Sequence, residues 1–324
     1  MELRSPIFIG GTGRSGTTII SKMIASHPLI SDVPETRFTV DPGGVYSFIS
    51  QQDVWSPYKS HESWKELNKM FTSMGEKSLF DDLISKVEKK YFSSFNFRMA
   101  KRYSNNFIPE YAPNFGKILN GFKNEIESFV YSMTWVGQNR FTKNKMTYLT
   151  ESSEEVMFLT RKFLNEIYHD ICLNQNVPIY FDTNTWNILN IEMIKRLWPD
   201  FKLVCIHRDP YQVINSFSKQ SWMPSNINQS TRIYLDLINR FNSNKQDYSD
   251  SILELNFEDF GIDPEAQMKK IFSFYGVKYS DSWRSVPFDF DRIIRPISKK
   301  VYAELKNNKE LDGIRSKYSY KGKV

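Results

Sequence analysis

One short segment of the chain has the residue types and the spacing of an anion-binding loop. Residues 10–18 read GGTGRSGTT and join a short apolar run, residues 6–9, to a stretch whose apolar positions recur at helical spacing. The first N–H groups of a helix have no partner within the helix, and they lie at the positive end of its dipole. We therefore expect an anion such as a phosphate group at this loop.

The cationic residue of this loop is not where the pattern G-x-x-x-x-G-K-[ST], which binds nucleoside triphosphates, would place it. Gly11 and Gly16 take the two glycine positions, and Thr18 takes the hydroxyl position. Thr17 replaces the lysine that contacts the outer phosphates in that pattern. The cation is instead Arg14, from where a side chain can reach the outer end of a bound 5′-phosphate. In the alternative interpretation the glycines only form a tight turn and Arg14 is solvated.

A second pair of residues could also bind an anion. Arg208 follows the strand-like run 202–206, and Ser216 comes eight positions later in a helix that Pro210 opens. A planar guanidinium suits a phosphate, and a hydroxyl two helical turns further on can contact the same group. Arg208 could instead pair with Asp209 or another carboxylate. An Arg and a Ser at this spacing are common in proteins, so the pair indicates a phosphate site only in combination with the first loop.

These segments resemble the sulfotransferases that use 3′-phosphoadenosine 5′-phosphosulfate (PAPS). The likeness rests on the first loop, on the helix that ends at His27-Pro28, and on residues 34–38, which read PETRF. In motif it is greatest to the tyrosylprotein sulfotransferases and their bacterial relatives, and it covers about residues 6–38 and 177–220. It implies binding of the 5′-phosphosulfate and the 3′-phosphate by Gly13, Arg14, Ser15, Gly16, Thr17, Thr18, Arg208 and Ser216.

The resemblance also implies a catalytic pair, Glu35 and Arg14. Sulfuryl transfer needs a base that removes the acceptor proton, and a carboxylate such as Glu35 can do so within hydrogen-bond reach. Arg14 would stabilise the charge that grows on the departing phosphate, a contribution that needs no metal. Without the resemblance, Glu35 would be interpreted as a capping residue or as an ion-pair partner near Arg37.

Two features leave alternatives open. Some sulfotransferases use histidine as the base, and this chain has His27, His61, His169 and His207. The family often has a lysine after the second strand that contacts the leaving group, but Thr183 stands at that place. A protein that binds PAPS or its product without turnover is therefore a second hypothesis. A kinase-like enzyme that uses ATP and Mg²⁺ is a third.

Strand-like and helical segments alternate on both sides of a long middle region. We expect strands at 177–181, 202–206 and 251–257, and helices at 17–26, 186–198 and 264–275. This alternation predicts an α/β domain of the P-loop type, with an open parallel sheet that has helices on both faces. Residues 46–176, where aromatic and charged residues mix at helical period, predict a large helical insertion within a single domain spanning 1–324.

Composition excludes several other classes of protein. The chain has 324 residues and 40% hydrophobic residues, with no apolar run that could span a membrane. Its formal charge is +6, which favours an anionic ligand without indicating a nucleic-acid surface. Two cysteines and no leader-like N-terminus favour the cytoplasm. No metal site is expected.

The acceptor is expected to be a hydroxyl group of a small molecule, lipid, saccharide or peptide, and the sequence leaves the oligomeric state open. Aromatic residues that could line an acceptor pocket are Trp55, Trp64, Trp135 and Trp222, although most of them are expected in the core.

Overall fold

The computed structural model describes residues 4–76, 107–134, 144–149, 152–290, 293, 297 and 299–318. The chain forms two compact units, which we call the sheet unit (Met1–Glu35 with Val177–Val324) and the helical unit (Thr36–Asn176). Every residue that the sequence assigns to the anion loop, the second anion site and the catalytic pair belongs to the sheet unit.

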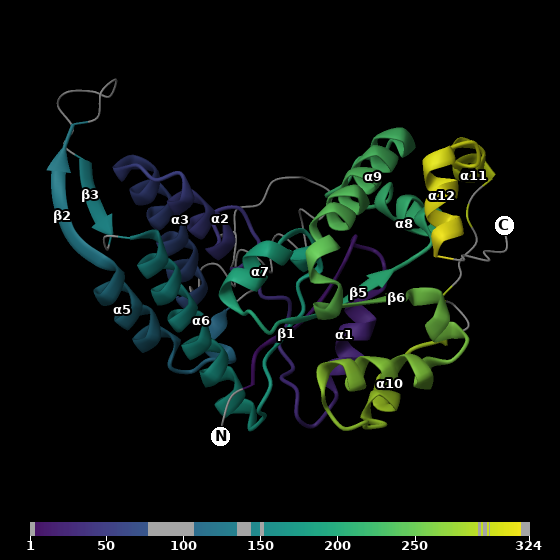
Figure 1. The fold of residues 1–324 in the computed structure, drawn as a ribbon, viewed down its shortest axis with the longest axis horizontal. Coiled ribbons are helices and arrows are strands. Elements are labelled where there is room, and N and C mark those ends of the chain that lie inside the picture. Colours follow the sequence, from purple (N-terminus) through teal and green to yellow (C-terminus); the bar gives the residue numbers. More distant parts are fainter. Residues whose placement is uncertain are drawn as a thin grey trace, which may run out of the picture. The chain divides into compact units, whose positions relative to one another are not determined.

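A parallel sheet organises the sheet unit. Its strand order is β4-β1-β5-β6 (Figure 1). The strands are β1 (Ile7–Gly11), β4 (Phe181–Asp182), β5 (Lys202–His207) and β6 (Ile252–Asn256). Ile7 pairs with Phe181 on one side and with Lys202 on the other, and every pair of neighbouring strands is parallel. The carboxyl ends of the strands therefore meet at one edge, where open α/β sheets bind ligands.

Helices cover both faces of this sheet. Ile7 and Ile9 of β1 point to the face that α1 (Thr17–Ala25) and α10 (Pro264–Tyr275) cover, and they share a buried cluster with those helices. Phe8, between them, points to the opposite face, where its ring lies 5.5 Å from that of Trp198. That face carries α7 (Ile191–Leu197), α8 (Pro210–Phe217) and α9 (Ile227–Asn244) (Figure 1). The predicted fold class is confirmed.

The end of the described chain packs on α8. Helices α11 (Lys299–Leu305) and α12 (Lys309–Lys317) bury Val301, Leu305 and Leu311 in a cluster with residues of α8 and α9. The sheet unit also contains the 3₁₀ turns η2 (Thr185–Leu189), η3 (Gln246–Ser251), η4 (Phe257–Gly261) and η5 (Ser282–Ser285).

The helical unit contains a β-hairpin that the sequence did not predict. Its helices are α2 (Val45–Asp53), α3 (Pro57–Gly75), η1 (Ile108–Glu110), α5 (Phe115–Ile126) and α6 (Ser153–Gln175). Strands β2 (Glu127–Met133) and β3 (Asn144–Leu149) pair in antiparallel fashion. The rings of Phe129 and Tyr148 stack across the hairpin with centroids 4.8 Å apart. Cross-strand aromatic pairs of this kind stabilise a hairpin but come from separate stretches of sequence.

Two predicted elements of the sheet unit differ from the structure. The helix predicted at 186–198 is divided into η2 and α7 at Asn190, whose side-chain amide donates to the carbonyl of Trp186 at 2.9 Å. Asn side chains compete with helical backbone hydrogen bonds in this way. The strand predicted at 177–181 pairs with β1 only at Phe181–Asp182, because Ile179 pairs instead with Ile30 in an isolated bridge.

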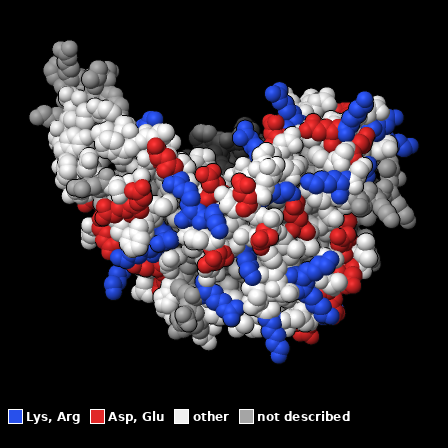
Figure 2. Space-filling model, viewed as in Figure 1, with Lys and Arg blue, Asp and Glu red and all other residues white. Residues whose placement is uncertain are grey.

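Charges of both signs are interspersed over the face of the molecule in Figure 2, where no uniformly basic stripe is visible. Over the part of the chain that the structure describes, no helix is both long and apolar enough to cross a membrane. Within the same residues, no group of three or more His, Cys, Asp or Glu side chains is arranged to hold a metal ion.

Candidate functional site

The backbone of the first loop has an unusual run of left-handed residues. The φ angles are 83° at Gly13, 56° at Arg14 and 96° at Gly16, the residue that precedes α1. Left-handed backbone is uncommon for a residue other than glycine, and such conformations gather at ligand-binding sites. Turns of this kind direct successive N–H groups into one concavity, which is a frequent form of anion site.

The hydroxyl side chains of the loop differ in their surroundings. Ser15 is fully buried, and its Oγ has no hydrogen-bond partner among the described residues. Thr17 is also buried, with its Oγ1 3.5 Å from Oγ1 of Thr185, whereas Thr18 and Arg14 are exposed. A buried hydroxyl without a partner costs free energy unless a ligand satisfies it. The loop therefore fits an anion with several oxygen acceptors.

The structure brings the two predicted anion sites together. The Nε atom of Arg14 donates to Oγ of Ser216 at 2.9 Å, and a terminal nitrogen of Arg208 donates to the carbonyl of Arg14 at 3.1 Å. The other terminal nitrogen of Arg208 donates to the carbonyl of Ile293 at 2.9 Å, and the guanidinium lies 5.2 Å from the ring centre of Phe257. Residues almost 200 positions apart thus meet at the carboxyl edge of the sheet.

Glu35 reaches the same edge along the outside of β4. The N–H of Ser31 donates to the carbonyl of Ile179 at 2.9 Å, and Oγ of Ser31 accepts from the N–H of Phe181 at 3.0 Å. This segment runs parallel to β4, so the chain from Ser31 to Glu35 heads toward the carboxyl end of the strand. Glu35 is half-buried there, and its charge acts on Asp182, the last residue of β4.

A buried polar network supports this end of the sheet. Oδ1 of Asp182 accepts from the side-chain amide of Asn187 at 2.9 Å and from the N–H of Asn184 at 3.0 Å. Burial, opposed by these hydrogen bonds and reinforced by the charge of Glu35, raises the pKa of Asp182 to about 6. The amide of Asn187 also donates to the carbonyl of Ile9 at 3.0 Å, which ties η2 to the strand that leads into the loop.

Trp222 is a residue of the site that sequence reasoning only partly identified. Its side chain is 52% exposed, and a Cβ atom placed on Gly13 would lie 3.5 Å from its ring. The rings of Phe217 and Trp186 pack edge-on against it, with centroids at 5.9 and 6.5 Å. The sequence signal for it is a tryptophan in a short segment of mostly polar residues, 218–226, that follows α8.

The other tryptophans singled out in the sequence have different positions. Trp64 is 2% exposed and belongs to the core of the helical unit, where its indole N–H donates to Glu127 at 2.8 Å. Trp55 is 53% exposed beside Tyr148 of the hairpin. Trp135 lies outside the described residues.

The two histidines of the sheet unit serve the fold. His27 accepts from the N–H of Leu29 at Nδ1, so its Nε2 donates to the carbonyl of Lys278 at 2.8 Å. His207 is buried at the end of β5, and its Nε2 bonds to Glu254 at 2.8 Å. Burial lowers the pKa of His207 in spite of this carboxylate, so the neutral ring is the donor.

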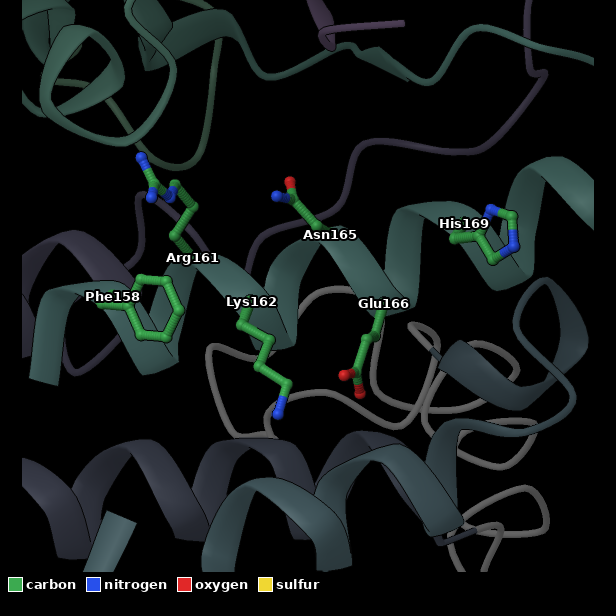
Figure 3. A pocket seen from close by; sticks show the side chains of 6 residues that line it. All are labelled: Phe158, Arg161, Lys162, Asn165, Glu166 and His169. Atoms are coloured by element: carbon green, nitrogen blue, oxygen red, sulfur yellow. The ribbon is translucent and has the colours of Figure 1, made fainter. Parts of the chain in front are cut away.

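The groove of about 370 Å³ in Figure 3 belongs to the helical unit, and the one candidate from the sequence that lines it is His169, which was considered as an alternative base. It follows one side of α6, with Phe158 at one end, Arg161, Lys162, Asn165 and Glu166 in the middle, and His169 at the other end. Lys162 pairs with Glu125 at 2.6 Å, so its ammonium is engaged within the unit. The groove is lined by side chains of α6 alone.

Comparison with known proteins gives the class of the chain. A model of the sulfotransferase family matches residues 6–281. The chain therefore belongs to the sulfotransferase family, whose members are enzymes that transfer a sulfuryl group. No curated protein sequence matches the chain.

Solved sulfotransferase structures resemble the chain at low sequence identity. One is the sulfotransferase domain from the curacin biosynthetic pathway, with 12% identity, a TM-score of 0.48 and full coverage of both chains. Another is sulfotransferase STF1 of Mycobacterium tuberculosis H37Rv, with 13% identity, a TM-score of 0.47, and coverage of 98% of this chain and 77% of that one. At these values the assignment rests on the family model.

Proposed function

We propose that the chain transfers a sulfuryl group from PAPS to an acceptor hydroxyl. The observation that carries this proposal is the convergence of the two anion sites, because Arg14, Ser216 and Arg208 form one hydrogen-bonded series at the sheet edge. A nucleotide with phosphates at both its 5′ and 3′ positions matches two adjacent anion sites. The left-handed loop and the unpartnered Ser15 hydroxyl would receive the 5′-phosphosulfate.

The chain's own residues suffice for the proton and charge balance of this reaction. The bond between sulfur and the phosphate oxygen breaks as a bond to the acceptor oxygen forms, and the acceptor proton passes to Glu35. Arg14 and the N–H groups of residues 13–18 would stabilise the negative charge on the departing phosphate. In-line transfer would place the acceptor oxygen opposite the departing phosphate.

The exposed aromatic ring of Trp222 beside Gly13 is a candidate surface for the acceptor. Its ring adjoins Gly13 rather than the interior of the core, and it remains half exposed. Exposed aromatic surface beside a reacting group is a common means of holding the apolar part of a ligand. We include Trp222 on the acceptor side of the proposed site.

One observation disfavours the first of two alternatives, and another supports the second. A kinase-like enzyme is disfavoured because Thr17, which faces Thr185, replaces the lysine of the triphosphate pattern. A PAPS-binding protein without turnover is supported by Thr183, since residues 177–190 contain no lysine.

Transfer of ³⁵S from labelled PAPS to a panel of phenols, alcohols and sugars, in the presence of EDTA, tests the proposal. We expect labelled product and release of the desulfated nucleotide (PAP) without added metal. Tight PAP binding with no labelled product would support the binding-protein alternative. Transfer of ³²P from ATP that depends on Mg²⁺ would support the kinase alternative.

A further inference from the structure

The residues on either side of Arg208 are held by the last described helix of the chain. Asp209 is 4% exposed, and its Oδ2 accepts from Nε and a terminal nitrogen of Arg315 at 3.2 and 2.9 Å. On the other side, the ring of His207 stacks on that of Tyr318, with centroids 4.4 Å apart and planes 23° apart. Arg315 lies in α12 and Tyr318 immediately follows it.

Each of these contacts is anchored by further bonds. Oδ1 of Asp209 accepts from the N–H of Tyr211 at 2.8 Å, which caps α8, the helix that carries Ser216. The guanidinium of Arg315 also lies 4.3 Å from the ring centre of Tyr211. The hydroxyl of Tyr211 lies 3.1 Å from both the carbonyl of Leu305 and Oδ1 of Asp312, which share its one proton, so α8 is bonded to α11 and α12.

The Tyr318 side is anchored equally well. The hydroxyl of Tyr318 donates to Oε2 of Glu254 at 3.1 Å, and the same carboxylate receives His207 and Lys245. Burial would raise the pKa of Glu254, but the hydrogen bonds from His207 and Lys245 outweigh it and lower this pKa to about 2. Glu254 is therefore ionised throughout the physiological range and fixes both rings.

We infer that Arg315 and Tyr318 are positioning residues for Arg208, and that the C-terminal helix thereby sets the affinity for the 3′-phosphate of the nucleotide. This inference rests on the proposed function, since it requires that Arg208 binds that phosphate. Arg208 follows the last residue of β5 and lies outside regular structure, so the backbone from which its guanidinium reaches Arg14 and Ile293 is set in part by its two neighbours. Both neighbours contact α12 or the residue that follows it.

We call Arg315 and Tyr318 the C-terminal clamp. Both residues lie outside the part of the chain that the family model matches. The match to the sulfotransferase family ends at residue 281, before α11 and α12 begin. A guanidinium displaced by about 1 Å from its phosphate loses much of a charge-assisted contact. Removing Arg315 would also leave Asp209 buried without its cation, which favours rearrangement of the turn.

The test compares two nucleotides that differ only in the 3′-phosphate, namely PAP and adenosine 5′-phosphate, titrated calorimetrically into the full chain. For Arg315→Ala we expect PAP to bind about 5- to 30-fold more weakly while adenosine 5′-phosphate changes less than about 2-fold. Arg315→Lys, which keeps the charge, should recover part of the PAP affinity. Tyr318→Phe, which loses only the hydroxyl bond to Glu254, should give a smaller loss of the same selectivity.

Arg284→Ala is the matched control. Arg284 forms an ion pair with Glu265 on the surface, and the described part of the structure shows no contact between Arg284 and Arg208, Arg315 or Tyr318. It should leave both affinities unchanged. Equal losses of PAP and adenosine 5′-phosphate in Arg315→Ala would overturn the inference and indicate general destabilisation. Unchanged PAP affinity in Arg315→Ala and Tyr318→Phe, with a selective loss in Arg208→Ala, would overturn the inference alone. No selective loss in Arg208→Ala would instead overturn the 3′-phosphate assignment on which it rests.

Discussion

At the scale of single residues, the proposed base and the proposed ligand of the 3′-phosphate come from distant parts of the chain. Glu35 arrives beside β4, whereas Arg208 leaves β5 and bonds to the backbone of the loop. The proposed role of Glu35 concerns the proton of the acceptor, and the proposed role of Arg208 concerns binding of the nucleotide. The two residues can therefore be tested separately.

Glu35→Gln preserves the size of the side chain but removes nearly all of its basicity. If Glu35 is the base, kcat should fall by about 10²- to 10⁴-fold while PAP affinity stays nearly constant. Steady-state kinetics and calorimetry measure the two quantities. Near-normal turnover in Glu35→Gln, with loss of turnover on replacement of His61 or His169, would contradict this role and favour a histidine base.

Arg208→Ala removes a partly buried, charge-assisted contact to the proposed 3′-phosphate. We expect a loss of about 2 to 4 kcal/mol in PAP affinity. Adenosine 5′-phosphosulfate lacks the 3′-phosphate and should lose little affinity in this variant, which makes it the control ligand. Equal PAP affinity in the wild type and the variant would refute the assignment.

At the scale of elements, the loop and the end of β4 have structures that only particular residues permit. Gly16 has a φ of 96°, and a Cβ atom placed on it would lie 2.3 Å from the ring of Phe257. Gly16→Ala should therefore destabilise the fold by about 2 to 4 kcal/mol through backbone strain and steric overlap. Denaturant unfolding measures the change.

Gly121→Ala is the matched control for this substitution. Gly121 lies within α5, and a Cβ atom there meets nothing within 4 Å. Alanine is favoured over glycine inside a helix, so this variant should be about 0.5 to 1 kcal/mol more stable than the wild type. If the two variants were equally stable, the strain ascribed to Gly16 would be wrong.

Asp182→Asn should change the pH dependence of stability. The pKa of Asp182 is raised from 3.8 to about 6 in the folded state. The protonated Asp182 side chain therefore contributes its full stabilisation below the unfolded-state pKa of 3.8, and this stabilisation is lost as the pH rises through the folded-state pKa of about 6. Asparagine does not titrate, so the variant should gain about 2 to 3 kcal/mol relative to the wild type between pH 4 and 7. If urea unfolding showed the same difference in the free energy of unfolding between variant and wild type at every pH in this range, the raised pKa of Asp182 would be contradicted.

Local sequence patterns predicted the strand, loop and helix from Ile7 to Ala25, because the glycines, the apolar run and the helical period all lie within a few turns of chain. They also predicted the start of α8 at Pro210 and the end of α10 before Gly276, which has a φ of 69°. The β2–β3 hairpin was missed because its stabilising ring pair joins Phe129 to Tyr148.

The remainder of the site could not be predicted for a similar reason. The bond from Arg14 to Ser216 and the ion pair from Arg315 to Asp209 join residues about 200 and 100 positions apart. From the sequence, Asp209 was one possible ion-pair partner of Arg208, whereas in the structure Asp209 forms its ion pair with Arg315. Such contacts depend on the folded arrangement of distant segments, which local sequence patterns do not predict.

At the scale of the whole molecule, we propose that this member of the sulfotransferase family binds PAPS at the sheet edge formed by the first loop and the end of β5. A ligand that binds only the folded state stabilises it, by about 2.7 kcal/mol at a concentration 100 times its Kd. The melting temperature in the presence of different nucleotides therefore reports which of them the folded chain selects.

The most direct measurement compares the melting temperature with PAPS, PAP and ATP at equal concentrations, each with Mg²⁺ and with EDTA. We predict that PAPS and PAP raise the melting temperature, equally with Mg²⁺ and with EDTA, and that ATP raises it much less. A larger rise with ATP and Mg²⁺ than with PAP, or no rise with either PAPS or PAP, would contradict the account.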